Sequence, residues 1–387
     1  MKVLYSTQSV VEYDGQHYYD NQIQATYKRY LILGDEITVL GYKKLVEKPK
    51  SDLVDDGAVK FAFAKKVNSF SAMLRRDSTW NDRLAEKLVQ ETDICVCHVP
   101  CGHSYQVIKY AKKYGKPYLT VVCGCPWDAL WNYDWRGKLL APNAYLSLRR
   151  IMRDAPYSIY VTNEFLQRRY PTNGKSIGCS NVNVSTGVEG VLEKRLTNIR
   201  KRAEEGRPLR IGTAAAIDVP YKGQEYVIRA LAKLKKEGIM YEYHLIGLGS
   251  GERLKCIAES EGVLDLVFFH GPLPHNKVLD FMDNLDIYVQ PSKQEGLPRA
   301  TIEAQSRGCL CLGSRVAGIP ELLEEDYLFA KGDVNRIAGI LSSVTFDTLE
   351  QQARRNFEVA KEYDQEVLNR RRADFIEEFK KSYTKQA

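Results

Sequence analysis

The stretch QPSKQEGLPRATIEA, residues 290–304, follows a short apolar run and changes its pattern within a few positions. The run at 285–290 predicts a buried strand, the glycine and prolines after it predict a loop, and a helical pattern begins near Arg299. In such a strand–loop–helix unit, free backbone N–H groups and the helix dipole face whatever lies above the loop. Gly296 has no Cβ and lets that backbone approach a ligand closely. The stretch is therefore typical of an anion-binding edge of an α/β sheet.

Two carboxylates frame this stretch, Glu295 in the loop and Glu303 on the first turns of the helix. Both could face one crevice and accept hydrogen bonds from hydroxyl groups. A plain strand–loop–helix with two solvated carboxylates has the same spacing, so spacing does not separate the two interpretations.

Short apolar runs alternate with helical patterns on both sides of this segment, which indicates parallel α/β units along the chain. In one of the helices, predicted at 224–236, Val227, Leu231 and Leu234 recur at helical spacing and form one buried face. A charged stretch at 189–208 separates two series of such units. The predicted domains are residues 1–190 and 207–346, followed by charged helices at 347–387. Two Rossmann-like domains in series bind ligands at the carboxyl ends of their strands.

The composition is that of a globular protein of more than one domain. The chain has 387 residues, 44% of them hydrophobic and 27% charged, with a net charge of +7. The nine cysteines lie mostly in apolar runs, which favours free thiols in a reducing cytoplasm. We recognise no secretory signal and no apolar run of membrane-spanning length, so we expect a cytoplasmic protein. The positive charge suits an anionic substrate or membrane face, whereas no motif supports binding of nucleic acid.

A group of cysteines and histidines at 95–103 has the residue types of a metal site. On a strand, Cys95 and Cys97 share a face while His98 points away. The spacing also differs from that of a zinc knuckle. We therefore expect buried free thiols and no metal.

Two further patterns have ordinary structural alternatives. The glycines at 247, 249 and 251 resemble a dinucleotide fingerprint, but the third comes one residue early, which favours a structural loop. Arg149, Arg150 and Arg153, together with Arg168 and Arg169, could attract anionic lipid headgroups. A solvated helix face is the alternative for these arginines.

The segment at 290–304 resembles the E-x7-E signature of the family 4 retaining glycosyltransferases, which have the GT-B fold. Similarity continues in YKGQ (221–224), LIGLG (245–249), VFFHG (267–271) and GCLCLGSRVAGIPE (308–321). In the first half, CGCPWD (123–128) and YVTNEFLQRRYP (160–171) resemble members from bacterial capsule and surface-polysaccharide clusters. The resemblance covers nearly the whole chain. It implies an α/β protein of two Rossmann-like domains facing across a cleft, with C-terminal helices that cross back to the N-terminal domain.

The resemblance also implies roles for individual residues. Lys222 would neutralise charge on the leaving phosphate, and Glu295 would contact hydroxyls of the donor sugar. Glu303 would hold the ribose of the donor nucleotide. The remaining implied donor-binding residues are Gly296, Leu297, Pro298, Arg299, Gly271, Leu273 and Gly15. The candidates for the acceptor pocket are His103, Cys123, Trp127 and Asp128.

The implied activity is that of a hexosyltransferase acting with retention. The donor would be a UDP- or GDP-sugar and the acceptor a lipid-linked oligosaccharide at the inner membrane, on the way to a capsule or to the O-antigen of lipopolysaccharide. The leaving phosphate would help to deprotonate the acceptor, so no protein general base is assigned. GT-B members do not usually need a metal, and we expect no required cofactor. Peripheral contact with the anionic membrane is compatible with this activity.

Two departures from the family pattern keep alternatives open. The family carries an arginine about five residues before Lys222, whereas this chain has AAAIDVP at 214–220; Arg299 is a candidate replacement. Many members have a histidine where this chain has Cys123. A non-catalytic protein that binds nucleotide sugars, and a GT-B epimerase or phosphorylase, are therefore the alternatives to a transferase.

Overall fold

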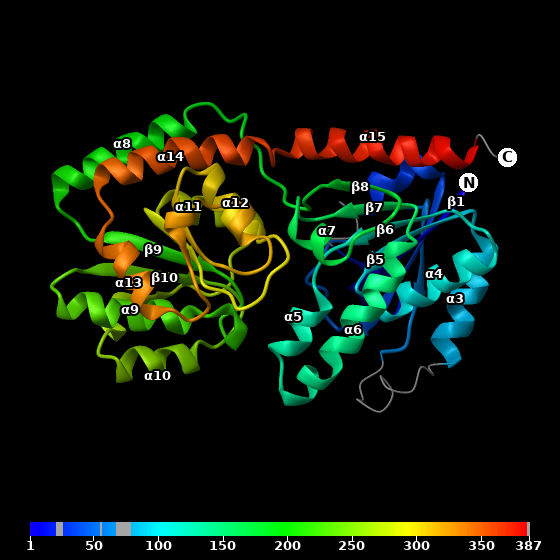
Figure 1. The fold of residues 1–387 in the computed structure, drawn as a ribbon, viewed down its shortest axis with the longest axis horizontal. Helices are drawn as coiled ribbons and strands as arrows, with labels where there is room; N and C mark the ends of the chain where they lie inside the picture. Colours follow the sequence, from blue (N-terminus) through cyan, green and yellow to red (C-terminus); the bar gives the residue numbers. More distant parts are fainter. Residues whose placement is uncertain (21–25, 55, 67–78, 385–387) are drawn as a thin grey trace. The chain divides into compact units, whose positions relative to one another are not determined.

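The computed structural model describes residues 1–20, 26–54, 56–66 and 79–384 (Figure 1). The chain forms two compact units. The first comprises Met1–Pro126, Pro142–Cys179 and Asn369–Ala387, and the second comprises Trp127–Ala141 and Ser180–Leu368. Each unit is built on a largely parallel sheet with helices, which confirms the predicted α/β class.

The sheet of the first unit has the strand order β4-β3-β1-β5-β6-β7-β8. Neighbours along this order pair in parallel, and β2 pairs with β1 in antiparallel fashion. The strands are β1 (Lys2–Tyr13), β2 (Tyr18–Tyr19), β3 (Glu36–Leu45), β4 (Val59–Phe63), β5 (Ile94–Val99), β6 (Tyr118–Val122), β7 (Tyr157–Tyr160) and β8 (Lys175–Gly178). The helices around it are η1 (Lys28–Leu33), α3 (Thr79–Glu91), α4 (Gly102–Lys113) and α7 (Phe165–Arg169), with α6 (Trp135–Arg153) shared between the units.

The sheet of the second unit has the order β11-β10-β9-β12-β13-β14, and all its neighbours pair in parallel. Its strands are β9 (Leu209–Ala214), β10 (Tyr241–Ile246), β11 (Val267–Phe269), β12 (Ile287–Gln290), β13 (Leu310–Ser314) and β14 (Leu328–Phe329). Its helices are α5 (Pro126–Trp131), α8 (Val191–Glu205), η2 (Pro220–Lys222), α9 (Gln224–Lys236), α10 (Glu252–Ser260), η3 (Leu264–Leu266), α11 (His275–Asp283), α12 (Arg299–Ser306), η4 (Ile319–Glu321), η5 (Glu325–Tyr327), α13 (Val334–Ser342) and α14 (Phe346–Lys361). The predicted face of α9 is confirmed, because Val227, Leu231 and Leu234 are all buried in this unit's core.

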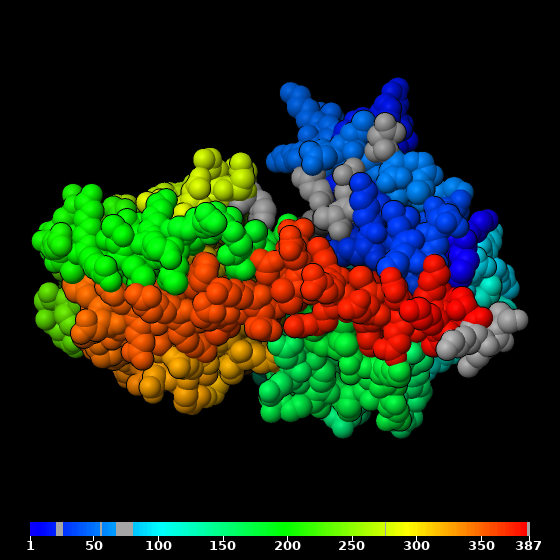
Figure 2. Space-filling model, turned by 90° about the horizontal axis from the view of Figure 1, so that it is seen from above, coloured from blue at the N-terminus to red at the C-terminus, as the bar shows by residue number. Residues whose placement is uncertain are grey.

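The last helix, α15 (Gln365–Thr384), returns to the first unit from Asn369 onward. The ring of Tyr157 lies 5.4 Å from that of Phe375 and 5.1 Å from that of Phe379. Lys380 donates to the carbonyl of Ile32 at 2.7 Å. In Figure 2 the red atoms of α15 lie against the blue atoms of the N-terminal segments. This confirms the predicted crossing for α15.

Helix α14 and the charged stretch before the second sheet belong to the second unit. Helix α14 packs against α8 and α12, although the sequence grouped it with the helices expected on the first unit. Helix α8 occupies most of the predicted boundary at 189–208, and it carries Leu196 and Ile199 into the same core. Both helices are amphipathic, and the sequence of an amphipathic helix does not show which unit its apolar face will cover.

Candidate functional site

The predicted strand–loop–helix is present: β12 ends at Gln290 and α12 begins at Arg299. Between them one carboxylate oxygen of Glu295, Oε1, accepts three hydrogen bonds. The donors are Lys222 Nζ at 2.6 Å, Ser292 Oγ at 2.7 Å and Gln290 Nε2 at 3.1 Å. For the second oxygen, Oε2, the described residues provide no hydrogen-bond partner. The side chain of Glu295 is 13% exposed, so Oε2 can meet a ligand from solvent.

A buried relay holds Glu295 in place. Tyr288 donates to Gln290 Oε1 at 2.6 Å, and Gln290 donates on to Ser292 and Glu295. The pKa of Tyr288 is raised by burial first, and then by the charges of Glu303 and Glu295. Both carboxylates of the E-x7-E pattern therefore lie close enough to act on one buried hydroxyl group.

Lys222 reaches this carboxylate because the backbone of η2 contacts the backbone of the loop after β12. Lys293 N donates to Tyr221 O at 2.7 Å. Gly223, which follows Lys222, has a φ of 75°, and a Cβ on it would lie 2.1 Å from the carbonyl oxygen of Pro291. The missing Cβ lets η2 approach the loop after β12, and this approach pairs residues 73 positions apart.

Except for Gly15, the other predicted donor residues lie on the same unit. Pro298 precedes α12 and makes no side-chain cap, Leu297 is 8% exposed, and Arg299 is exposed. Glu303 lies in α12 and is 9% exposed. Gly271 and Leu273 follow β11, and Gly271 O accepts from Gly247 N at 3.0 Å. Because the sheet is parallel, these segments follow the same edge of it as Glu295.

The glycine loop after β10 is filled by the chain itself. Asp218 accepts hydrogen bonds from Ser250 N at 2.7 Å and from Gly251 N at 3.0 Å. These amides open α10, so a carboxylate of the protein occupies the position that a phosphate takes in a dinucleotide site. This supports the interpretation of the loop as structural.

Gly15 lies in the first unit, in the tight turn between β1 and β2. Asp14 Oδ1 accepts from the backbone N–H groups of Gln16 and His17, and Gly15 itself has a φ of 109°. The turn accounts for a glycine here, because other residues rarely adopt this φ. Its predicted approach to the donor phosphates stays a prediction.

On the first unit, Cys123 lies beside a histidine to which the sequence assigned no role. His98 Nδ1 lies 3.5 Å from Cys123 Sγ, and His98 Nε2 lies 2.8 Å from the hydroxyl of Tyr5. The three residues come from β1, β5 and the end of β6, which are neighbours in the sheet. In the sequence, only the position of His98 near the end of an apolar run indicated that it could lie at the edge of the sheet. Strand alternation predicted that it faces away from Cys97, but not which residues it contacts.

The pKa of His98 is lowered to about 4, first by burial and then by the charges of Arg372 and Arg29. The ring is therefore neutral at pH 7, with one nitrogen able to donate and the other to accept. A neutral imidazole at the carboxyl edge of a sheet is suited to bind a hydroxyl group.

We predict that His98→Gln reduces the loss of stability in acid. Between pH 6.5 and pH 4 the unfolded chain protonates this ring while the folded chain does not, so the wild type loses stability as pH falls. The contribution at pH 4.5 is about 2 kcal/mol after allowance for partial exposure. Urea unfolding at pH 7 and pH 4.5 measures it, with the exposed His17→Gln as control. The same pH dependence in His98→Gln and wild type would contradict the prediction.

His103, the predicted acceptor residue, is 3% exposed. Its Nε2 lies 2.7 Å from the carbonyl oxygen of Thr7, and its ring packs edge-on against Tyr42 at 5.2 Å. These are the contacts of a core histidine.

Trp127 and Asp128 lie on α5, in the second unit. The Trp127 ring stacks on Trp131 at 5.1 Å. Asn132, just after α5, donates to Asp128 O at 2.8 Å and to Lys293 O at 3.4 Å. Trp127 and Asp128 therefore lie in the same compact unit as Lys222 and Glu295. The segment that carries them contacts the loop after β12.

Within the described part of the chain, no three or more His, Cys, Asp or Glu side chains are placed to hold a metal ion. Cys95, Cys97 and Cys101 are free and buried, as predicted. Burial raises the pKa of Cys95 to about 12, so this thiol stays protonated. In the same described residues, no helix has the length and apolarity to cross a membrane.

A known family model matches the part of the chain that contains these residues. Residues 197–361 match the family model "Glycosyl transferases group 1". The matched residues lie within the second unit. The matched segment contains Lys222, Glu295 and Glu303, the residues around which the site is built.

Two curated relatives match more than half of the chain. Protein CapJ of Staphylococcus aureus is 30% identical over 258 residues, which cover 66% of this chain and 63% of CapJ. The amylovoran biosynthesis glycosyltransferase AmsK of Erwinia amylovora is 29% identical over 254 residues, 60% of this chain and 62% of AmsK. The chain thus spans less than two thirds of the length of either relative.

Solved structures show the fold. Sucrose-phosphate synthase from Thermosynechococcus elongatus has a TM-score of 0.73 at 12% identity, over 97% of this chain and 98% of that one. Anabaena Alr3699/HepE in complex with UDP has a TM-score of 0.65 at 16% identity, over 98% and 100%. The fold is GT-B, as predicted.

Proposed function

We propose that this chain is a retaining glycosyltransferase of bacterial surface-polysaccharide biosynthesis. It would move a hexosyl group from a UDP- or GDP-sugar to a lipid-linked oligosaccharide. The observation that carries the proposal is the Lys222–Glu295 pair, held at the carboxyl edge of a parallel sheet beside the start of α12. The name of AmsK, an amylovoran biosynthesis glycosyltransferase, supports the polysaccharide context, and the UDP complex of HepE supports a nucleotide-sugar donor.

The proposed chemistry places a cation where negative charge grows. When the bond between the anomeric carbon and the leaving phosphate breaks, Lys222 Nζ and the N-terminus of α12 stabilise the phosphate. Glu295 Oε2 accepts a hydrogen bond from a hydroxyl of the donor sugar, and Glu303 holds the ribose. The acceptor oxygen bonds to the same face of the anomeric carbon, and its proton passes to the leaving phosphate. This route needs no protein base, and we propose no metal or cofactor.

On the first unit we propose that Cys123 and the neutral ring of His98, which the buried Tyr5 holds in place, meet the acceptor. Cys123 stands where the family often has a histidine, and the structure puts the imidazole of His98 beside it. We further propose a cytoplasmic enzyme in peripheral contact with the inner membrane, where a lipid-linked acceptor lies.

A non-catalytic protein that binds nucleotide sugars is the second candidate. The stretch at 214–220 contains no arginine, and its Asp218 caps α10 instead of serving a ligand. Release of free sugar from a nucleotide sugar by the purified protein would separate the two, because a non-catalytic binder would release none.

The donor site is tested by thermal stability with a panel of nucleotides and nucleotide sugars. A ligand at one hundred times its Kd stabilises the native state by about 2.7 kcal/mol, a shift of a few degrees. We expect one UDP- or GDP-sugar to give this shift in the wild type. Glu303→Ala should lose most of it, because a charge-assisted hydrogen bond to the ribose is worth roughly 2 kcal/mol.

The exposed Glu358→Ala, on α14, is the matched control and should keep the full shift. A nucleotide response of equal size in Glu303→Ala would refute the ribose assignment. A wild type that responds to no nucleotide would refute the donor site as a whole.

A further inference from the structure

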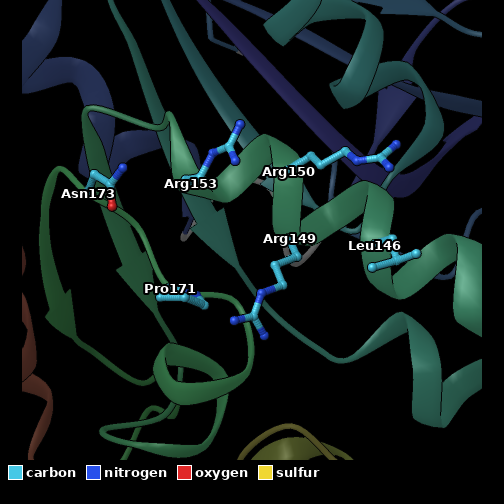
Figure 3. A pocket seen from close by; sticks show the side chains of 6 residues that line it. All are labelled: Leu146, Arg149, Arg150, Arg153, Pro171 and Asn173. Atoms are coloured by element: carbon cyan, nitrogen blue, oxygen red, sulfur yellow. The ribbon is translucent and has the colours of Figure 1, made fainter.

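A cavity of about 250 Å³ lies at the C-terminal end of α6, in the first unit (Figure 3). It is lined by Leu146, Arg149, Arg150, Arg153, Pro171 and Asn173. The first four side chains come from successive turns of α6, and the last two come from the segment between α7 and β8. Lys222, Glu295 and Glu303 lie in the other unit, and Gly15 is not among the residues that line the cavity, so this cavity is a separate feature.

The second wall of the cavity is fixed to the helix by hydrogen bonds. Asn173 N donates to Arg153 O at 3.0 Å, and Thr172 Oγ1 donates to Ala155 O at 2.5 Å. Further along, Lys175 N donates to Pro156 O at 2.9 Å as β8 begins. Carbonyl groups at and just beyond the end of α6 thus hold the segment, so the cavity is built into the fold.

The charge in the cavity is strongly positive. Arg149 donates to the uncharged hydroxyl of Tyr145 at 2.6 Å, so this contact does not neutralise the charge of the guanidinium group. Arg153 lies 3.4 Å from Asp154, which is shared with Lys112. Arg150 makes no ion pair or hydrogen bond with any described residue.

The helix dipole offers a plainer account of part of this cluster. Cations in the last turn of a helix are favourable, and Arg150 and Arg153 are in the last turn of α6. The dipole does not require that a second segment close a cavity around them. It also does not explain Leu146, which is 47% exposed beside the arginines.

We propose that this cavity binds the phosphate group of an anionic phospholipid and so holds the first unit on the membrane surface. Guanidinium groups present paired donors that match phosphate oxygens. Leu146 and Pro171 add an apolar edge, which suits an amphiphile better than a free phosphate ion. The choice of a lipid as the ligand rests on the proposed function, in which the acceptor is lipid-linked. The inference that the cavity binds a phosphate group does not depend on that function.

The test is sedimentation of the full chain with vesicles of phosphatidylcholine, with and without one third phosphatidylglycerol. The variant R149Q/R150Q/R153Q should lose about 10- to 100-fold in partition onto the anionic vesicles. The control K201Q/R207Q/R229Q removes the same charge from exposed positions of the second unit and should bind as the wild type does. Melting curves check that both variants are folded.

Three results would overturn the inference. Equal binding by the cavity variant and the wild type would mean that the cavity is not used. Equal loss in both variants would mean that only net charge matters. If inorganic phosphate or pyrophosphate stabilises the wild type but not the cavity variant, and vesicles do not bind, the ligand is free phosphate and not a lipid. The thermal response to nucleotide sugars is read separately, so failure of the donor site leaves this test unaffected.

Discussion

Lys222→Met should lower the rate of sugar transfer by about 100- to 1000-fold while the protein remains folded. The ammonium group is the cation paired with Glu295, at 2.6 Å, and its side chain is 21% exposed. Removal takes away charge stabilisation that grows only as the leaving phosphate departs, so the loss should fall mainly on kcat. Glu295 keeps the hydrogen bonds from Ser292 and Gln290, so the cost to folding should be about 1 kcal/mol.

Lys293→Met is the matched control, since Lys293 lies in the same loop as Glu295 but pairs with Glu225 at 3.5 Å. It should change the rate far less. The measurement is turnover of the donor identified by thermal shift, with melting curves for both variants. Comparable losses in the two variants would show that the loop responds to any loss of charge, and Lys222 would not have the proposed role.

The local structure around this site follows from the sequence. The apolar run before Gln290, the prolines and Gly296 are local signals, and they placed β12, the loop and α12 correctly. The face of α9 was likewise readable, because a helix that covers a sheet must repeat its apolar residues at helical spacing.

Contacts between segments that are distant in the sequence could not be predicted from such local signals. The Lys222–Glu295 pair joins residues 73 positions apart. It depends on a backbone contact at Gly223 that the periodicity of the sequence does not predict. The first strand extends to Tyr13 and pairs with β3, although polar residues such as Ser6 and Gln8 interrupt its apolar run. His98 gains its significance from Tyr5 and Cys123, which reach it through strand order and not through sequence.

Gly223→Ala should be strongly destabilising, although it adds only a single methyl group. The new Cβ would lie 2.1 Å from the carbonyl oxygen of Pro291, which is backbone and cannot rotate away. The left-handed φ of 75° costs about 1 kcal/mol for alanine, and relief of the overlap should bring the loss of stability to about 3 kcal/mol. Because relief means moving η2 away from the loop after β12, Lys222 should also leave Glu295.

Gly238→Ala, just after the other end of α9, isolates the overlap from the backbone conformation. Gly238 has a φ of 79°, and no atom lies within 4 Å of the position that its Cβ would take. It should lose only about 1 kcal/mol and keep full activity. Urea unfolding and donor turnover of the two variants provide the comparison. Similar losses of stability in both, with turnover retained in Gly223→Ala, would mean that η2 and the loop after β12 can separate without cost, and the contact at Pro291 would not be what positions Lys222.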